Sequence, residues 1–141
     1  MNESQQFCTF FLNKHCFGVP VEQVQEVLRY HVMTSVPLAP REVSGLINLR
    51  GQIVTVIDLR TCLKLPDRKP LSGGTNVIVR TGDEVVSLLV DEMGSVQYVE
   101  ESQFEPPPDT LRGVSREFIT GTYKLPATLL LVLDVAKVSL P

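Results

Sequence analysis

The side chains best suited to chemistry in this sequence are two cysteines and two histidines in its first quarter. Cys8, His15, Cys16 and His31 carry the thiolate and imidazole groups that bind zinc. Their spacing does not fit a zinc site, because no CxxC or HxxxH pair occurs and the adjacent His15 and Cys16 would point to opposite faces of a strand. Buried or half-buried free thiols are the better interpretation. We therefore expect no metal site.

Hydroxyl and carboxylate side chains give no catalytic motif. The serines lack the GxSxG pattern, and Gly73-Gly74 has no following Gly-Lys that would indicate a phosphate-binding loop. Asp58 and Asp134 could be phospho-acceptors or catalytic carboxylates, but each ends a β-rich run and precedes a stretch that could form a brief helix. An aspartate at such a place is typical of a helix cap. The sequence thus predicts no catalytic residue and no cofactor.

The most distinctive stretch is GLINLRGQIVTVIDLR, residues 45–60, in which two apolar runs flank a polar centre. Residues 53–59 are rich in β-branched side chains, which predicts a strand buried on most of its surface. Arg50-Gly51 is expected to be the turn, since glycine accepts the positive φ that a tight hairpin connection often requires. An arginine fixed beside the tip of a hairpin is an unusual feature to build for stability alone, and nothing in this stretch resembles catalytic chemistry.

Composition excludes several classes of protein. The chain has 141 residues, 43% of them hydrophobic and 21% charged, as in an ordinary soluble globular domain. A net charge of −3 gives no general attraction to nucleic acid or anionic lipid. Three cysteines at irregular spacing argue against a disulfide framework and fit a reducing cytoplasm. The start lacks a signal-peptide pattern, and no apolar run has the length of a membrane span.

Short strand-like segments alternate with turn signals along the whole chain. Residues 20–28 are ambiguous between helix and strand, and a single helical turn leading into a strand is favoured. Gly82-Asp83 indicates a hairpin. The fold class is therefore all-β with a few short helices. The expected strands are residues 7–12, 16–21, 25–30, 46–47, 53–59, 76–80, 85–90, 96–99 and 128–133.

An approximate internal repeat indicates two similar units. Gly45 precedes Asp58 by the same number of residues as Gly121 precedes Asp134, and each aspartate ends an apolar run. Residues 17–24 have a plausible partner in residues 86–93, although chance similarity between apolar strands is a competitor. We expect one domain, 1–141, made of two small β-barrels packed side by side. Their approximate limits are 10–74 and 75–141, with possible exchange of terminal strands and with the loop at 64–75 near the join.

At these residues the chain resembles a known family. The hairpin at 45–60 is similar to the signature of the CheW-like domain of bacterial chemotaxis. The resemblance extends to FGVPVEQVQEV at 17–27, VVSLLVD at 85–91 and the segment from Thr120-Gly121 to LLLVLD at 129–134. The same domain occurs in CheA kinases and CheV coupling proteins. This chain shows neither a histidine-kinase nor a receiver region, so it resembles the free-standing adaptor.

The resemblance implies two five-stranded β-barrels, no enzymatic activity and two simultaneous partners. These partners are the cytoplasmic tip of a chemoreceptor and the regulatory domain of a CheA-type histidine kinase, in a cytoplasmic protein recruited to membrane-associated arrays. It also implies a receptor-binding groove, with no nucleic acid bound and no membrane insertion. The residues of this sequence that match the groove are Val24, Glu26, Gly45, Arg50 and Val96.

Each of these residues also has an interpretation without a partner. Val24 and Val96 could belong to the core, and Gly45 could serve only a turn. Arg50 could form a salt bridge within the protein, and Glu26 could simply be solvated on a polar face. Thr55 stands where the family often has proline; it restores a backbone donor, so local edge geometry could differ.

Two functional alternatives accompany the adaptor. One is a specialised paralogue that scaffolds a non-flagellar chemosensory pathway. The other is a small β-barrel that binds nucleic acid. This second alternative is disfavoured, because it would need a basic face with stacking aromatic side chains, and the acidic balance and sparse aromatics argue against one.

Overall fold

A computed structural model describes residues 4–29, 32–65, 74–109 and 116–138. The expected strands at 7–12, 16–21, 53–59, 76–80, 85–90 and 128–133 are present with small shifts of their ends, and those expected at 46–47 and 96–99 are present but several residues longer. The helical turn before the third strand is also present, and the described part of that strand ends at Arg29. The elements are β1 (Ser4–Leu12), β2 (His15–Pro20), η1 (Val21–Gln23), β3 (Val24–Arg29), β4 (Val43–Leu49), β5 (Gln52–Asp58), α1 (Leu59–Cys62), β6 (Thr75–Thr81), β7 (Glu84–Val90), β8 (Glu92–Glu100), η2 (Glu101–Gln103), η3 (Arg116–Phe118), β9 (Ile119–Lys124), β10 (Leu129–Leu133) and α2 (Val135–Val138).

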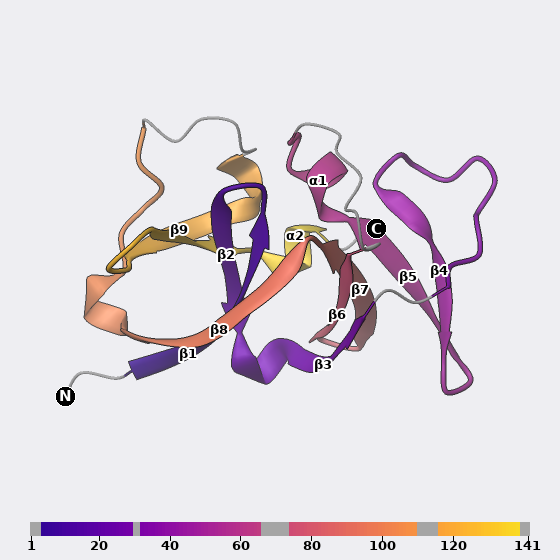
Figure 1. The fold of residues 1–141 in the computed structure, drawn as a ribbon, viewed down its shortest axis with the longest axis horizontal. Helices are drawn as coiled ribbons and strands as arrows, with labels where there is room; N and C mark the ends of the chain where they lie inside the picture. The colour runs from indigo at the N-terminus through magenta and orange to yellow at the C-terminus, as the bar shows by residue number, and fades with distance from the viewer. Residues whose placement is uncertain (1–3, 30–31, 66–73, 110–115, 139–141) are drawn as a thin grey trace.

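The strands form two five-stranded sheets that lie side by side (Figure 1). Sheet 1 has the order β8-β1-β2-β10-β9, and sheet 2 has the order β3-β6-β7-β5-β4. The predicted fold class, all-β with a few short helices, is confirmed. The ladders give linear strand orders, so closure of each sheet into a barrel stays a prediction.

The chain changes sheet twice. It leaves sheet 1 after Pro20 and returns to it after Val90, so sheet 2 is built from one continuous stretch and sheet 1 from both ends of the chain. Sheet membership therefore does not follow the expected boundary between residues 74 and 75. The division into units at that boundary remains a prediction, and most of the loop at 64–75 lies outside the described residues.

The internal repeat is confirmed by the pairing registers. The parallel pair Leu131 with Phe17 in sheet 1 has its counterpart in Thr55 with Val86 in sheet 2. The antiparallel pairs agree as well, since Val132 faces Gly121 just as Val56 faces Gly45. In the repeat, β1, β2, β8, β9 and β10 thus correspond in turn to β6, β7, β3, β4 and β5.

Gly45 and its counterpart Gly121 are glycine for the same structural reason. At both positions a segment that follows an edge strand crosses over the glycine and makes one bridge, Thr34 to Leu46 in sheet 2 and Glu105 to Thr122 in sheet 1. A Cβ atom on Gly45 would lie 2.7 Å from the Thr34 carbonyl oxygen, and one on Gly121 would overlap the Phe104 ring. Gly45 lies within β4, so the interpretation of this residue as a turn is wrong.

The repeated aspartates are helix caps, as predicted. The Asp58 carboxylate accepts a hydrogen bond from the Arg60 backbone N–H at 3.0 Å, and the Asp134 carboxylate accepts one from the Lys137 N–H at 3.4 Å. Each cap starts a helix of four residues directly after the strand next to one edge of its sheet, β5 or β10. The same short helix therefore follows the same strand in both halves.

One large core joins the two sheets. Strands of both sheets and both short helices contribute side chains to it, so the halves cannot bury these surfaces separately. Two smaller clusters lie within the individual sheets. Because central strands pack on both faces, they carry continuous apolar runs instead of simple alternation. Fully buried members of the shared core include Phe10, Phe17, Val19, Ile57, Leu59, Leu63, Val77, Val79 and Leu88.

A buried ion pair fixes the second crossing between the sheets. Asp91 lies at that crossing, and its carboxylate accepts a hydrogen bond from Arg60 Nε at 2.9 Å, a second contact from Arg60 Nη2 and one from the Asn13 backbone N–H at 3.0 Å. The Arg60 side chain is 6% exposed. This network ties α1 of sheet 2 to the β1–β2 turn of sheet 1.

Replacing Arg60 should destabilise the fold strongly. Arg60→Ala leaves the largely buried Asp91 carboxylate without this cation, which is expected to lower the free energy of unfolding by about 3 kcal/mol. Arg80→Ala is the matched control, because this arginine is exposed and contacts Gln25 at 3.3 Å; its expected loss is below about 1 kcal/mol. Urea unfolding followed by circular dichroism measures both. Equal losses in the two variants would contradict the assigned role of Arg60.

Candidate functional site

The tip of the β4–β5 hairpin is a two-residue turn, as predicted. Arg50 and Gly51 both have left-handed backbones, with φ of 51° and 88°, and the Gly51 N–H donates to the Asn48 side chain at 2.8 Å. A left-handed arginine costs about 1 kcal/mol more than a glycine would at this place. The position therefore carries a long cationic side chain on a backbone conformation that favours glycine.

Arg50 forms an ion pair with Glu26. Its Nη1 donates to Glu26 Oε1 at 3.2 Å, and its Nη2 contacts Oε2, so the pair is bidentate. Glu26 belongs to β3 and Arg50 to the tip of the hairpin whose first strand is β4, and β3 and β4 are the two edge strands of sheet 2. The salt bridge within the protein, offered by the sequence as an alternative, is thus present, and it brings the edges of the sheet toward each other.

This pair is at the surface. The Arg50 side chain is 67% exposed and that of Glu26 is 24% exposed. The hydrogen bond from Arg50, with a further contribution from its charge, lowers the pKa of the Glu26 carboxyl despite an opposing effect of burial. The same hydrogen bond raises the pKa of Arg50. Both groups therefore stay charged at neutral pH, and the guanidinium keeps donors directed to solvent.

The other predicted site residues lie in different surroundings. Val24 is half-buried and packs against the shared core, so its core interpretation applies at least in part. Gly45 is buried beneath Thr34. Val96 is 44% exposed and lies on β8, the edge strand of sheet 1. The structure thus brings Glu26 and Arg50 into contact and places Val96 on the other sheet.

A β-bulge precedes Val96. The register of β1 with β8 shifts between Cys8 and Phe10, and the Thr9 hydroxyl donates to the Ser95 carbonyl inside this bulge. A Cβ on Gly94 would overlap the Thr9 hydroxyl, lying 2.5 Å from its oxygen. The register of β3 with β6 shifts in the same way between Val24 and Glu26. Bulges re-aim side chains, so both halves use one to orient the residues that follow.

The repeat identifies one exposed residue that the sequence analysis missed. Val27 pairs with Val77 on β6, and Val96 pairs with Cys8, the counterpart of Val77 on β1. Val27 is 43% exposed, nearly the same fraction as Val96. Aligning the two halves would have paired these valines. Tyr98, 69% exposed on β8, is a further apolar side chain on this edge that was missed.

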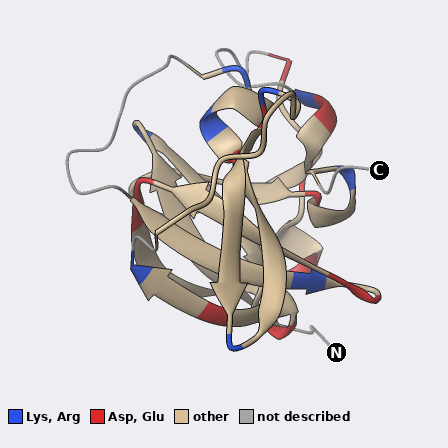
Figure 2. Cartoon of the chain, turned by 90° about the vertical axis from the view of Figure 1, so that its right-hand side faces the viewer, with Lys and Arg blue, Asp and Glu red and all other residues tan. Residues whose placement is uncertain are grey.

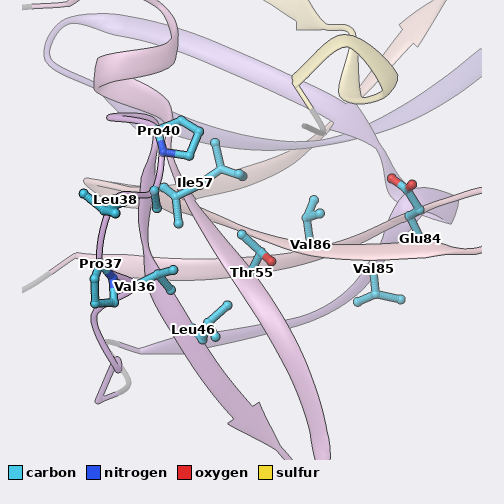
Figure 3. A pocket seen from close by; sticks show the side chains of 12 residues that line it. Val36, Pro37, Leu38, Pro40, Leu46, Thr55, Ile57, Glu84, Val85 and Val86 are labelled. Atoms are coloured by element: carbon cyan, nitrogen blue, oxygen red, sulfur yellow. The ribbon is translucent and has the colours of Figure 1, made fainter. Parts of the chain in front are cut away.

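A separate apolar groove lies beside β4, β5 and β7 (Figure 3). Its volume is about 670 Å³, and one wall is the segment 36–40, where Leu38 is fully exposed with a left-handed φ of 64°. Thr55 lies toward the middle of the groove, between Leu46 of β4 and Val86 of β7. The expected effect of Thr55 on edge geometry does not apply, because β5 has neighbours on both sides.

The thiols are poor candidates for chemistry. The structure has Cys8, Cys16 and Cys62 as free thiols that are buried or half-buried, as predicted. Burial, followed by nearby carboxylates of which Glu42 has the largest effect, raises the pKa of Cys62 to about 11. Burial also raises the pKa of Cys8 and of Cys16. His31 lies outside the described residues, and within those residues no three His, Cys, Asp or Glu side chains are grouped to hold a metal.

Comparison with known proteins agrees with this geometry. The CheW-like domain model matches residues 6–140. The chain belongs to the CheW family. It is 29% identical to the chemotaxis protein CheW of Treponema pallidum over 96% of this chain and 82% of that protein. It is 30% identical to the protein FrzA of Myxococcus xanthus over 74% of this chain and 65% of that protein.

A solved structure has the same fold. The scaffolding protein TtCheW from Thermoanaerobacter tengcongensis superposes with a TM-score of 0.84 at 27% identity, covering 93% of this chain and 84% of that one. The CheW family consists of scaffolding and adaptor proteins of chemotaxis signalling and is not a known family of enzymes. Helices long and apolar enough to cross a membrane do not occur in the described ranges.

The ion pair makes a direct prediction for titration. Carbon-detected NMR should give Glu26 a pKa below the usual ~4.3 of a glutamate, and Arg50→Ala should raise it by removing the hydrogen bond. Because the folded-state pKa is lowered, the stabilisation by the pair is complete above the usual pKa and is lost as pH falls through the lowered one. Arg29→Ala, on the same strand, is the control. An unchanged Glu26 titration in Arg50→Ala would show that the pair does not persist in solution.

Proposed function

We propose that this CheW-family protein couples chemoreceptors to a CheA-type histidine kinase. It would bind the cytoplasmic tip of a receptor and the regulatory domain of the kinase at the same time, without chemistry of its own. The observation that carries the proposal is the hairpin tip, where a strained arginine pairs with Glu26 and stays exposed. The protein would act in the cytoplasm and be recruited to membrane-associated receptor arrays.

The proposed receptor surface contains Val24, Glu26, Gly45, Arg50 and Val96. An amphipathic helix at a receptor tip can place an apolar stripe against exposed valines while polar groups set its register. Arg50 supports this arrangement, because a guanidinium has five donors and the bidentate pair with Glu26 uses two of them. Gly45 would contribute indirectly, because its lack of a side chain lets the segment at Thr34 pass close to β4.

We assign the groove of Figure 3 to the kinase regulatory domain. The groove is lined mainly by apolar side chains, among them Val36, Leu46 and Val85, and all of its lining residues differ from those of the proposed receptor surface. Two separate surfaces permit both partners to bind at once. Individual contacts of this size are expected to be modest, with cooperativity in the array adding strength.

A second candidate is a paralogue that scaffolds a non-flagellar chemosensory pathway. The likeness to FrzA, a relative that does not carry the name CheW, supports this second candidate. Binding of nucleic acid has less support. Figure 2 shows Lys and Arg interspersed with Asp and Glu on the face in view, with no continuous basic stretch there. A salt-dependent affinity for single-stranded DNA would be needed to revive that alternative.

Two substitutions test the receptor surface. Arg50→Ala and Val96→Glu should each weaken binding of a receptor-tip fragment at least about tenfold, because the first removes the cation and the second places a charge in an apolar contact. Both side chains are at the surface, so the unfolding transition should stay near that of the wild type. Calorimetry gives the affinities and circular dichroism the stability.

Val36→Glu is the matched control for the receptor titration. It places the same charge on a valine of similar exposure in the groove assigned to the kinase. This variant should bind the receptor fragment normally and lose affinity for the kinase regulatory domain. Wild-type receptor binding by folded Arg50→Ala and Val96→Glu would overturn the assignment of the receptor surface.

A further inference from the structure

The repeat relates the buried Arg60 to a position where the side chain is missing. Arg60 is the second residue after the cap Asp58, and Ala136 is the second residue after the cap Asp134. The turns that face these helices correspond as well, since Asn13 and Gly82 occupy the same place with φ of 57° and 60°. Asp91 ends the crossing after β7, and Glu22 holds the matching place after β2.

In the first half, the arginine side chain is almost fully buried. The Arg60 guanidinium lies between α1, the end of β7 and the β1–β2 turn, where Asp91 receives two of its N–H groups. Asp91 in turn accepts the Asn13 N–H and donates its own N–H to the Phe11 carbonyl at 3.2 Å. In this half, the socket therefore binds a guanidinium group.

In the second half, the corresponding socket is an open cavity. Its volume is about 230 Å³, and its lining includes Pro20, Gln23, Thr81, Thr120, Asp134 and Ala136. In the repeat these elements are the counterparts of those around Arg60: the end of a central strand, a hairpin turn, the cap and the short helix. The methyl group of Ala136 replaces the arginine and leaves the space unfilled.

The chemistry of the cavity favours a planar cation. Asp134 is the carboxylate among the lining residues, and the polar residues Thr81, Thr120 and Gln23 line the cavity with it. The Asp134 carboxylate accepts a hydrogen bond from the Lys137 backbone N–H and retains capacity to accept further ones. Glu22, the counterpart of Asp91, is exposed and precedes Gln23 in η1; it does not line the cavity and contributes negative charge only from nearby. A volume near 230 Å³ is below the ~300–1,000 Å³ of sites that bind small organic ligands, so a single side chain is the better match.

We infer that this cavity receives an arginine side chain from a protein partner, as its counterpart receives Arg60 from the chain itself. A guanidinium matches carboxylate and carbonyl oxygens in a plane, whereas a lysine ammonium is a strongly hydrated point charge. The inference does not depend on which partner supplies the arginine or on the proposed receptor and kinase surfaces. A failure of its test would leave the proposed function intact.

The test uses N-acetyl-arginine amide as the probe. Titrated into the ¹⁵N-labelled full chain, it should shift the backbone amides of residues 22–23, 81, 120 and 134–136, with a dissociation constant on the order of 1 mM. N-acetyl-lysine amide should bind at least about threefold more weakly. Ala136→Arg fills the socket from within the chain, so it should weaken probe binding at least about tenfold and leave Tm unchanged or raised.

Ala127→Arg is the matched control. It adds the same charge at an exposed position in the turn between β9 and β10, and it should leave probe binding within about twofold of the wild type. Glu22→Gln, at another exposed position, removes a negative charge near the cavity without adding a larger side chain. It should weaken probe binding about threefold.

Three outcomes would overturn the inference. The first is the absence of localised shifts in the wild type with arginine amide at several times the expected dissociation constant. The second is equal binding of the probe by Ala136→Arg and Ala127→Arg. The third is an equal response to the arginine and lysine probes, which would show that the cavity does not select a guanidinium.

Discussion

The two crossings of the chain between its sheets are the constraint on which the rest of the structure depends. β3 and β8 each belong to the sheet opposite the strand before them. Each repeat unit, β1–β5 or β6–β10, therefore gives strands to both sheets and cannot complete a sheet alone. The shared core follows from this exchange, since it takes side chains from both sheets and both short helices. The Arg60–Asp91 pair fixes the second crossing, and the proposed receptor surface lies on the edge strands β3, β4 and β8.

The exchanged strands are also where binding is expected. As edge strands, β3 and β8 carry Val27 and Val96 at matching positions, and each has a bulge just before them. The hairpin then reaches from β4 across to β3 through Arg50 and Glu26. Edge strands are a liability unless they are charged, bulged or covered. Here an ion pair and two bulges protect the edges while leaving apolar side chains available to a partner.

Sequence patterns predicted most elements and, together with the family resemblance, two five-stranded units side by side, but not the strand order or the contacts between distant segments. The β-branched run at 53–59, the Arg50-Gly51 turn and the capping aspartates were predictable because local chemistry determines them. Strand β9 was missed, since Gly121 and two threonines interrupt its apolar pattern, although its counterpart β4 in the repeat could have indicated it. The contact between Glu26 and Arg50, and the close crossing at Gly45, depend on how distant segments meet, which no local pattern encodes.

Two partners should bind this protein at the same time on separate surfaces, and calorimetry of the ternary complex tests this most directly. The protein would first be saturated with the regulatory domain of a CheA from the same cell and then titrated with a receptor-tip fragment. We expect the receptor affinity to stay within about threefold of that of the protein alone, because the two surfaces share no residue. Loss of receptor binding in the presence of the kinase domain, or no binding by either partner, would contradict the account.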